Sequence, residues 1–411
     1  MSVHRSADPV RTYYVYNAAW SFLAALSFTL SAVYYVRDAG LNPLQMVLVG
    51  TTLELACFLF EIPTGIVADL YSRRLSIVIG FALIGAGFLL QGLVPAFLAI
   101  LAAQVLWGVG FTFTSGADQA WITDEIGTER AAPVFIRAQQ FELGGKIAGI
   151  VSAGALGLVS LPLPMALSGG GMILLALMLA VFMREQNFHR TPKDERETFR
   201  QMAETFKSGL EAARRRPVVR TLVIISLIAG LASEAFDRLW SVKLLTFSFP
   251  TVFGTSDPAF WFTVLALAGT LLSLGASLLL NRFSAERLQA SHPTGVLATL
   301  AGLDVLGMFL FAFAGHLWIA LAALWLRQIA DTVTHPIHSA WLNRHIDSRS
   351  RATVLSMVSQ ANAIGQVVGG PPLGAVGRTS LRGALLASGL IWLPIPALYL
   401  RLKEARSTSA V

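Results

Sequence analysis

Long apolar segments follow one another along nearly the whole chain, separated by short polar stretches. An apolar segment of about 20 residues is long enough to cross the hydrocarbon core of a membrane as a helix. Membrane strands are not expected, because they alternate apolar and polar residues over only about 10 positions. The pattern predicts an all-α membrane protein with twelve transmembrane helices, near residues 12–36, 44–69, 75–93, 96–121, 137–159, 163–182, 218–242, 260–281, 294–314, 316–341, 353–376 and 382–401.

The longest polar stretch follows the sixth predicted span. Apolar side chains recur in it at three- or four-residue spacing among charged residues, at Phe199, Met202, Phe206 and Leu210. This spacing predicts an amphipathic helix at the membrane surface. We therefore expect an N-terminal six-helix half, a cytoplasmic linker and a C-terminal six-helix half, at residues 1–182, 183–217 and 218–411.

An internal repeat supports this division. A shift of 220 residues superposes Gln140 on Gln360, and it also superposes two glycines of the fifth span, Gly145 and Gly149, on Gly365 and Gly369. A shift of 209 residues superposes the start of the first span on the start of the seventh. Six spans separate the members of each pair, so the two halves are expected to run in the same direction.

Composition places most of the chain in lipid. Of its 411 residues, 55% are hydrophobic and 13% are charged, whereas a soluble domain carries about 25% charged residues. The net charge of +7 does not predict a nucleic-acid partner, because most basic residues lie in the segments assigned to the cytoplasm. We expect a bacterial inner-membrane protein with both termini in the cytoplasm and only four basic residues outside it: Arg37, Lys243, Arg378 and Arg382.

The signatures of common enzymes are missing from the sequence. The only cysteine, Cys57, lies within an apolar span, so no disulfide framework is predicted. The chain has neither the Gly-rich loop that binds nucleotide phosphates nor a cluster of histidines with metal-ligand spacing. We predict no catalytic residue, metal or cofactor, and an energy source in an ion gradient or in the gradient of the solute itself.

A polar motif lies between the second and third predicted spans, from Gly65 to Arg74. It resembles the signature of this loop in major facilitator transporters: a glycine, small or apolar residues, an aspartate and a basic pair. This resemblance implies two six-helix halves around a central cavity and a gating role for Gly65, Asp69, Arg73 and Arg74. Glycine would allow a close approach between helices. The motif departs from the family pattern at Leu70 and Ser72, where Arg and Gly are usual.

Other segments resemble the drug-efflux branch of that superfamily, in particular Ser115–Trp121 and Glu61–Gly65. In the drug–proton antiporters an arginine that helps proton transfer occupies the position of Gln104, and the fifth helix contains a proline. Here the fifth span lacks proline, and the proline pair lies in the eleventh span. The resemblance therefore extends to the superfamily more fully than to the antiporter mechanism.

Charged residues within the spans are the candidates for proton coupling, because an ionised side chain at the bilayer centre costs at least about 2.5–3.5 kcal/mol. The candidates are Glu54, Glu142, Lys146, Arg327 and Asp331. The last four form two pairs spaced by four residues, and each pair can neutralise itself on one helix face. Both pairs are therefore open to a purely structural role. Glu54 has no obvious partner on its own helix and is the leading candidate for a protonation switch, whereas Asp304 is expected to be structural.

Several polar and aromatic side chains suit an amphiphilic or aromatic solute, including a cationic one. We expect them to line the substrate cavity: Asn17, Trp20, Gln104, Trp107, Phe111, Glu234 and Asp237. The alternative for the aromatic residues is an interfacial belt.

The sequence thus predicts a monomeric secondary transporter whose partners are a small solute, protons or another coupling ion, and the lipid bilayer. The leading hypothesis is proton-coupled efflux of an amphiphilic or drug-like compound by alternating access. An uptake symporter or facilitator of a small metabolite is the alternative. A membrane sensor or lipid-handling protein on the same fold is the alternative from another class.

Overall fold

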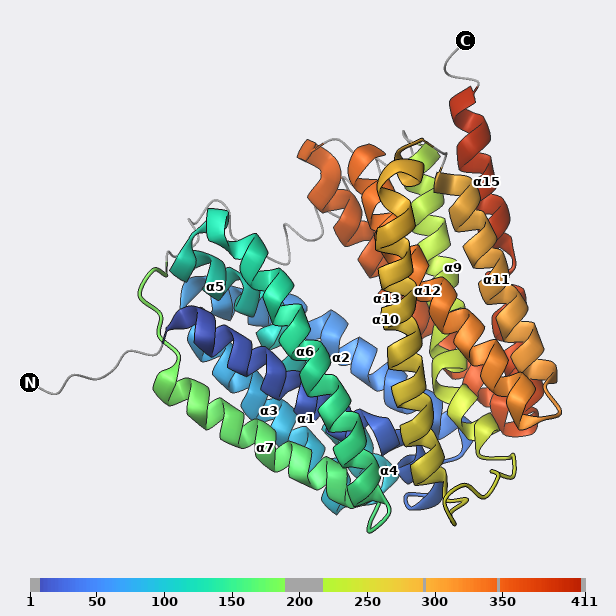
Figure 1. Ribbon diagram of the computed structural model, residues 1–411, viewed down its shortest axis with the longest axis horizontal. Coiled ribbons are helices and arrows are strands. Elements are labelled where there is room, and N and C mark those ends of the chain that lie inside the picture. Colours follow the sequence, from blue (N-terminus) through green and yellow to red (C-terminus); the bar gives the residue numbers. More distant parts are fainter. Residues whose placement is uncertain (1–7, 189–216, 291–292, 346–347, 408–411) are drawn as a thin grey trace, which may run out of the picture. The chain divides into compact units, whose positions relative to one another are not determined.

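The computed structural model describes residues 8–188, 217–290, 293–345 and 348–407, which are almost entirely helical (Figure 1). Its helices are α1 (Pro9–Arg37), α2 (Pro43–Leu70), α3 (Arg73–Leu93), α4 (Phe97–Thr114), α5 (Ala117–Ile126), α6 (Thr128–Gly157), α7 (Pro162–Phe182), α9 (Pro217–Leu244), α10 (Pro258–Ala290), α11 (Pro293–Phe313), α12 (Leu317–His345), α13 (Ser348–Thr379), α14 (Leu381–Trp392) and α15 (Pro394–Ser407). The amphipathic helix predicted in the linker lies outside the described residues.

The prediction of twelve spans is confirmed when α4 is counted with α5 and α14 with α15. Within the described ranges, nine spans are long and apolar enough to cross a membrane by length and composition alone. The remaining three, α6, α12 and α13, carry more polar residues. The fifth span begins at Thr128, earlier than predicted, because its first turns are too polar for hydropathy to reveal.

The fourth span is broken near one end. Gly116 separates α4 from α5 and has a positive φ of 73°, a conformation that glycine adopts without steric cost. The break places Asp118 in the first turn of α5, where its negative charge complements the helix dipole. Asp118 also accepts a hydrogen bond of 3.2 Å from the Tyr16 hydroxyl of α1.

The chain divides into two compact units. Unit 1 contains α1 and α3–α7, together with α2 from Thr52 onward and α10 up to Leu267. Unit 2 contains α9 and α11–α15, together with the start of α2 up to Thr51 and the part of α10 from Ala268. Helices α2 and α10 therefore each contribute to both units.

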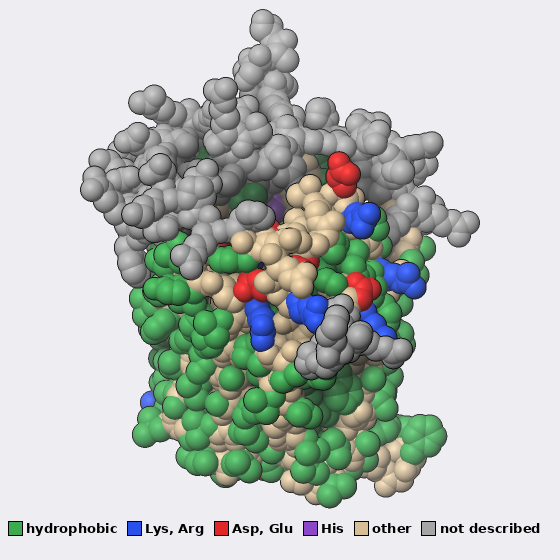
Figure 2. Space-filling view, turned by 90° about the vertical axis from the view of Figure 1, so that its left-hand side faces the viewer, with side chains coloured by type: hydrophobic (Ala, Val, Ile, Leu, Met, Phe, Trp, Pro, Cys, Tyr) green, Lys and Arg blue, Asp and Glu red, His purple; other side chains and the backbone are tan. Residues whose placement is uncertain are grey.

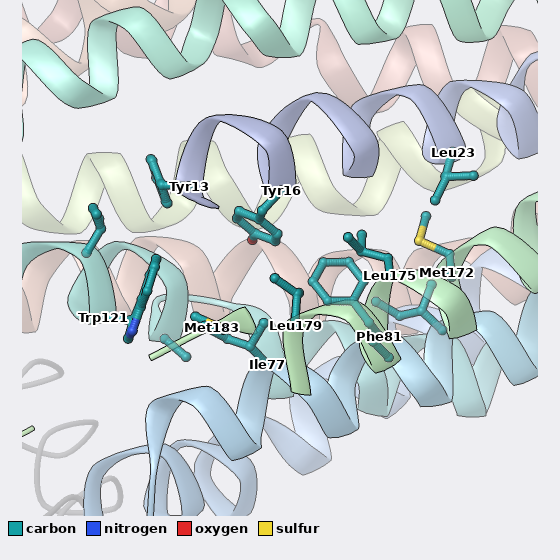
Figure 3. Packing of buried hydrophobic residues seen from close by; sticks show 14 of the residues in the cluster. Tyr13, Tyr16, Leu23, Ile77, Phe81, Trp121, Met172, Leu175, Leu179 and Met183 are labelled. Carbon is teal, nitrogen blue, oxygen red and sulfur yellow. The ribbon is translucent and has the colours of Figure 1, made fainter. Parts of the chain in front are cut away.

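In unit 1, α1 packs along α6, and α3 packs against both α4 and α7. Its core includes Tyr16 of α1, Phe81 of α3 and Leu175 of α7, which point toward one another (Figure 3). The rings of Tyr16 and Phe81 meet edge to face at 5.5 Å. In unit 2, α9 packs along α13 and α11 packs against α12, so the pairing of α1 with α6 recurs as the pairing of α9 with α13.

The same glycine contacts hold both helix pairs together. In each contact, a Cβ on the glycine would collide with a carbonyl oxygen of the facing helix: Gly145 with Ala18, Gly149 with Phe22, Gly365 with Leu227 and Gly369 with Leu231. The glycines of the two halves differ by 220 in residue number and the carbonyl residues by 209. These are the two offsets of the sequence repeat, and the contacts of the glycines explain why the offset of 220 was detectable.

The surface separates charged from apolar side chains. Figure 2 shows acidic and basic side chains gathered across the middle of one face, whereas apolar side chains cover most of the surface below them. Many large apolar side chains are exposed along the spans, among them Leu98, Leu174 and Val181. Such a surface is stable in lipid but not in water.

Candidate functional site

Unit 2 contains a cluster of charges centred on Arg327 of α12. Its Nε donates a hydrogen bond of 2.7 Å to Asp304 Oδ1 of α11, and its guanidinium carbon lies 3.9 Å from the ring centroid of Phe236 of α9. Its Nη1 lies 4.0 Å from Asp237 Oδ1 of α9. The predicted pairing of Arg327 with Asp331 on the same helix is wrong for this structure: the ion pairs found among the described residues join Arg327 to Asp304 and Asp237.

A second pair lies one helical turn from this cluster. Arg238 Nε donates to Glu234 Oε1 at 3.0 Å, and the Glu234 side chain is buried. The start of α2 covers the pair, since a Cβ on Gly50 would collide with both side chains. Glu234 was predicted to line the substrate cavity, but in this structure it is sealed in a neutral pair.

Together, the Arg327 cluster and the Glu234–Arg238 pair contain one more carboxylate than arginines. Asp304 neutralises Arg327 at hydrogen-bond distance, and Arg238 neutralises Glu234. Asp237 is then an additional carboxylate, 4.0 Å from an arginine that already has a closer partner. Its side chain is 58% exposed, although it belongs to a membrane span. An exposed carboxylate in a membrane span is expected to contact water or a ligand, or to bind a proton, because contact of the ionised group with lipid is costly.

Gln104 belongs to a neutral cluster of hydrogen-bonded side chains in unit 1. Gln91 Oε1 of α3 accepts hydrogen bonds from Tyr35 Oη of α1, at 2.7 Å, and from Gln104 Nε2 of α4, at 3.0 Å. All three side chains are buried. Asn17 is also buried and donates to the Tyr13 carbonyl at 2.7 Å. Both Gln104 and Asn17 thus pack inside unit 1 in this structure and do not line an open cavity.

The predicted aromatic residues of the cavity differ in exposure. Trp107 packs against the rings of Phe28 and Phe88, at 4.9 and 5.9 Å between centroids. Trp20 meets Phe81 edge to face at 5.5 Å. Phe111 of α4 is exposed and is the most accessible of the three predicted residues.

The remaining coupling candidates lie in unit 1. Glu54 of α2 is partly buried and makes a polar or electrostatic contact, so it is not an isolated carboxylate. Glu142 is partly buried and Lys146 is exposed on α6. No ion pair joins them in the described part of the chain, although their spacing allowed one. The predicted self-neutralisation of this pair is therefore absent from the structure.

The loop between α2 and α3 forms polar contacts with the segment that follows α7 and with helix α5. The backbone N–H groups of Arg73 and Arg74 donate to Glu185 Oε1 at 2.7 and 3.2 Å, and the Ser72 hydroxyl donates to the same carboxylate. A carboxylate at the N-terminus of α3 is favoured by the helix dipole. Arg73 also forms an ion pair with Asp124 of α5.

The structure thus identifies two partners of this motif that the sequence analysis missed. Glu185 could have been noticed as an acidic residue directly after the sixth span, whereas Asp124 has no such signal.

The two remaining residues of the predicted gating motif are Asp69 and Gly65. Asp69 is partly buried in the last turn of α2. A Cβ on Gly65 would meet no atom within 4 Å, so the close helix approach predicted at Gly65 is absent here.

The fold agrees with the comparisons to known proteins. A profile described as the Major Facilitator Superfamily matches residues 14–406, and the chain belongs to this superfamily. The chain is 22% identical over 364 residues to YxaM of Bacillus subtilis (strain 168), described as an uncharacterized MFS-type transporter; the match covers 89% of this chain and 88% of the relative. The protein is thus a multi-pass membrane transporter of the major facilitator type and not an enzyme.

Solved structures show the same fold at low sequence identity. The nucleoside transporter NupG superposes with a TM-score of 0.73 at 13% identity, over 96% of this chain and 98% of NupG. A bacterial homolog to the human lysosomal transporter Spinster, inward-facing and unoccupied, superposes with a TM-score of 0.68 at 16% identity, over 97% of each chain. At these identities the likeness establishes the fold alone.

Proposed function

We propose that this transporter exports an amphiphilic cationic solute in exchange for protons, by alternating access in the inner membrane of a bacterium with both termini in the cytoplasm. The observation that carries the proposal is the exposed Asp237 carboxylate, which is additional to the two neutral pairs around it. A cation and a proton would compete for this one carboxylate. Since only one of the two is bound at a time, competition produces exchange.

The charges around Asp237 support this role. When Asp237 is ionised, it is attracted to Arg327, which lies 4.0 Å away. Protonation or cation binding removes that attraction, while Asp304 and the Phe236 ring keep the guanidinium in place. Binding therefore changes the electrostatics of the cluster without leaving Arg327 unpaired, which would be costly inside a membrane.

The neutral cluster at Gln104 also favours unit 2 as the coupling unit. Gln91, Gln104 and Tyr35 carry no charge that could accept or release a proton, and they are buried together. The fourth span therefore lacks the arginine through which the antiporters of this superfamily are expected to act. Glu54 of α2 is the second candidate for the coupling carboxylate.

The test uses inverted membrane vesicles with an imposed pH gradient, acidic inside, and ethidium as the probe cation. The parent protein should accumulate ethidium in the vesicles and release protons as it does so. Asp237→Asn should lose gradient-driven accumulation and bind ethidium more weakly, and this residual binding should no longer be weakened by protons. Asp331→Asn is the matched control, because it removes an exposed carboxylate one turn from Arg327 that is not its partner.

The outcomes separate the candidate functions. Full gradient-driven transport by Asp237→Asn would exclude this carboxylate, and loss of coupling in Glu54→Gln would then assign it to α2. Solute movement in the same direction as protons would instead indicate an uptake symporter. Binding with no flux under any gradient would indicate a sensor or lipid-handling protein.

A further inference from the structure

The connection between α9 and α10 contains a tight two-residue turn. Val252 and Thr255 exchange two backbone hydrogen bonds, of 2.9 and 3.1 Å. Between them, Phe253 and Gly254 both have positive φ angles, 51° and 78°. Positive φ at both central residues is the signature of a type I′ turn, which favours Asn, Asp or Gly at these positions. Phenylalanine is an unusual residue at this tip.

Phe253 is the only non-glycine residue with a positive φ in the part of the chain that the structure describes. A bulky side chain in this region of φ/ψ space is a genuine outlier. Such outliers persist where the surrounding structure enforces them, and they concentrate at functional positions. The geometry of the turn therefore does not explain why phenylalanine occupies its tip.

The turn presents this ring to its surroundings. Phe253 is 94% exposed, the largest exposure among the large apolar side chains of the described residues. The turn is also fixed to the start of α10: the Asp257 N–H donates to Thr255 Oγ1 at 3.1 Å, and the Ala259 N–H donates to Asp257 Oδ1 at 2.7 Å. The ring is thus held at a defined place beside the end of a membrane span.

The location of the turn indicates lipid as its partner. The residues from 245 to 256 carry no acidic or basic side chain, and they connect the candidate membrane spans of α9 and α10. Of the nine candidate spans in the described ranges, α10 is the least buried within the protein. Aromatic rings next to exposed spans concentrate where the hydrocarbon meets the head groups.

We propose that the turn at residues 252–255 anchors this loop in the membrane, with the Phe253 ring inserted into the lipid interface on the face opposite the chain termini. The ring removes its apolar surface from water at a depth where the polar backbone of the turn stays hydrated. The hydrogen bonds to Asp257 then fix the level of the start of α10 relative to the bilayer. This anchor is independent of Asp237 and of the direction of transport.

The test places a nitroxide spin label at position 253. Phe253→Cys is made on a Cys57→Ser background, since Cys57 is the only native cysteine, and the protein is reconstituted in phosphatidylethanolamine–phosphatidylglycerol liposomes. We expect the label to collide more with oxygen, which concentrates in lipid, than with a water-soluble nickel chelate. Asp38→Cys in another exposed loop is the aqueous control, and Leu271→Cys on the exposed face of α10 is the lipid control.

The accessibility of the label to oxygen and to the nickel chelate tests the proposal. A label at 253 that matches the Asp38 control, or one immobilised by protein contact, would overturn it. A second variant separates the ring from the fold. Phe253→Asn suits the turn better, so it should retain thermal stability in detergent while increasing deuterium uptake by residues 250–256 in liposomes. Unchanged uptake in liposomes would also contradict an anchoring role.

Discussion

The contact between α1 and α6 makes a sharp prediction at two adjacent glycines. A Cβ on Gly145 would collide with the Ala18 carbonyl oxygen, whereas a Cβ on Gly144 would meet no atom within 4 Å. The variants Gly145→Ala and Gly144→Ala therefore add the same methyl group to the same helix. They differ only in whether a neighbouring helix occupies the space.

The expected energies follow from this difference. Replacing glycine by alanine within a helix is favourable by about 1 kcal/mol when nothing opposes it, which is the situation at Gly144. Overpacking a filled site costs about 1–3 kcal/mol, and at Gly145 the obstructing atoms are backbone, which cannot rotate away as a side chain can. We expect the two variants to differ by about 2 kcal/mol, with Gly145→Ala the less stable.

Thermal unfolding of the purified protein measures this difference. A dye that fluoresces on reaction with a thiol reports exposure of Cys57, which is partly buried on α2. A difference of about 2 kcal/mol corresponds to a shift of about 4–8 °C for a domain of about 150–250 residues. Equal midpoints for the two variants would refute the contact between α6 and α1, and with it the structural basis of the repeat.

Three further predictions concern the polar contacts. Glu185→Ala removes the acceptor of two backbone N–H groups at the start of α3, so it should lower the unfolding midpoint by an amount equivalent to about 1–3 kcal/mol, and an unchanged midpoint would contradict the contact. Arg327→Met leaves Asp304 without its closest partner and should cost about 3–5 kcal/mol; the double variant Arg327→Met with Asp304→Leu should recover stability, and no recovery would show that the pair is not the cause. Gln104→Leu should cost about 1–3 kcal/mol through the loss of its bond to Gln91 and leave proton exchange intact, so uncoupled transport in this variant would refute a purely structural role.

The local pattern of the sequence was sufficient for the spans. A membrane helix satisfies its own backbone hydrogen bonds, so its position depends mainly on a continuous run of apolar residues. The predicted boundaries agree with the helices to a few residues, except at the start of α6 and at the end of α10, where the helix continues to Ala290. The repeat offset of 220 was also readable, because the glycines that contact α1 and α9 tolerate no larger residue.

The functional chemistry depended on contacts between helices. Spacing along one helix suggested Asp331 as the partner of Arg327, but the arginine binds Asp304, which lies 23 residues away on α11. Likewise, the sequence could not decide whether Gln104 faces a cavity or the interior, because this depends on how α4 is rotated against α1 and α3. The sequence by itself determined the spans and the repeat, since these follow from local hydropathy and local spacing. Only the tertiary structure decided which charges neutralise one another and that Asp237 remains exposed, since those outcomes depend on the faces that neighbouring helices turn toward each other.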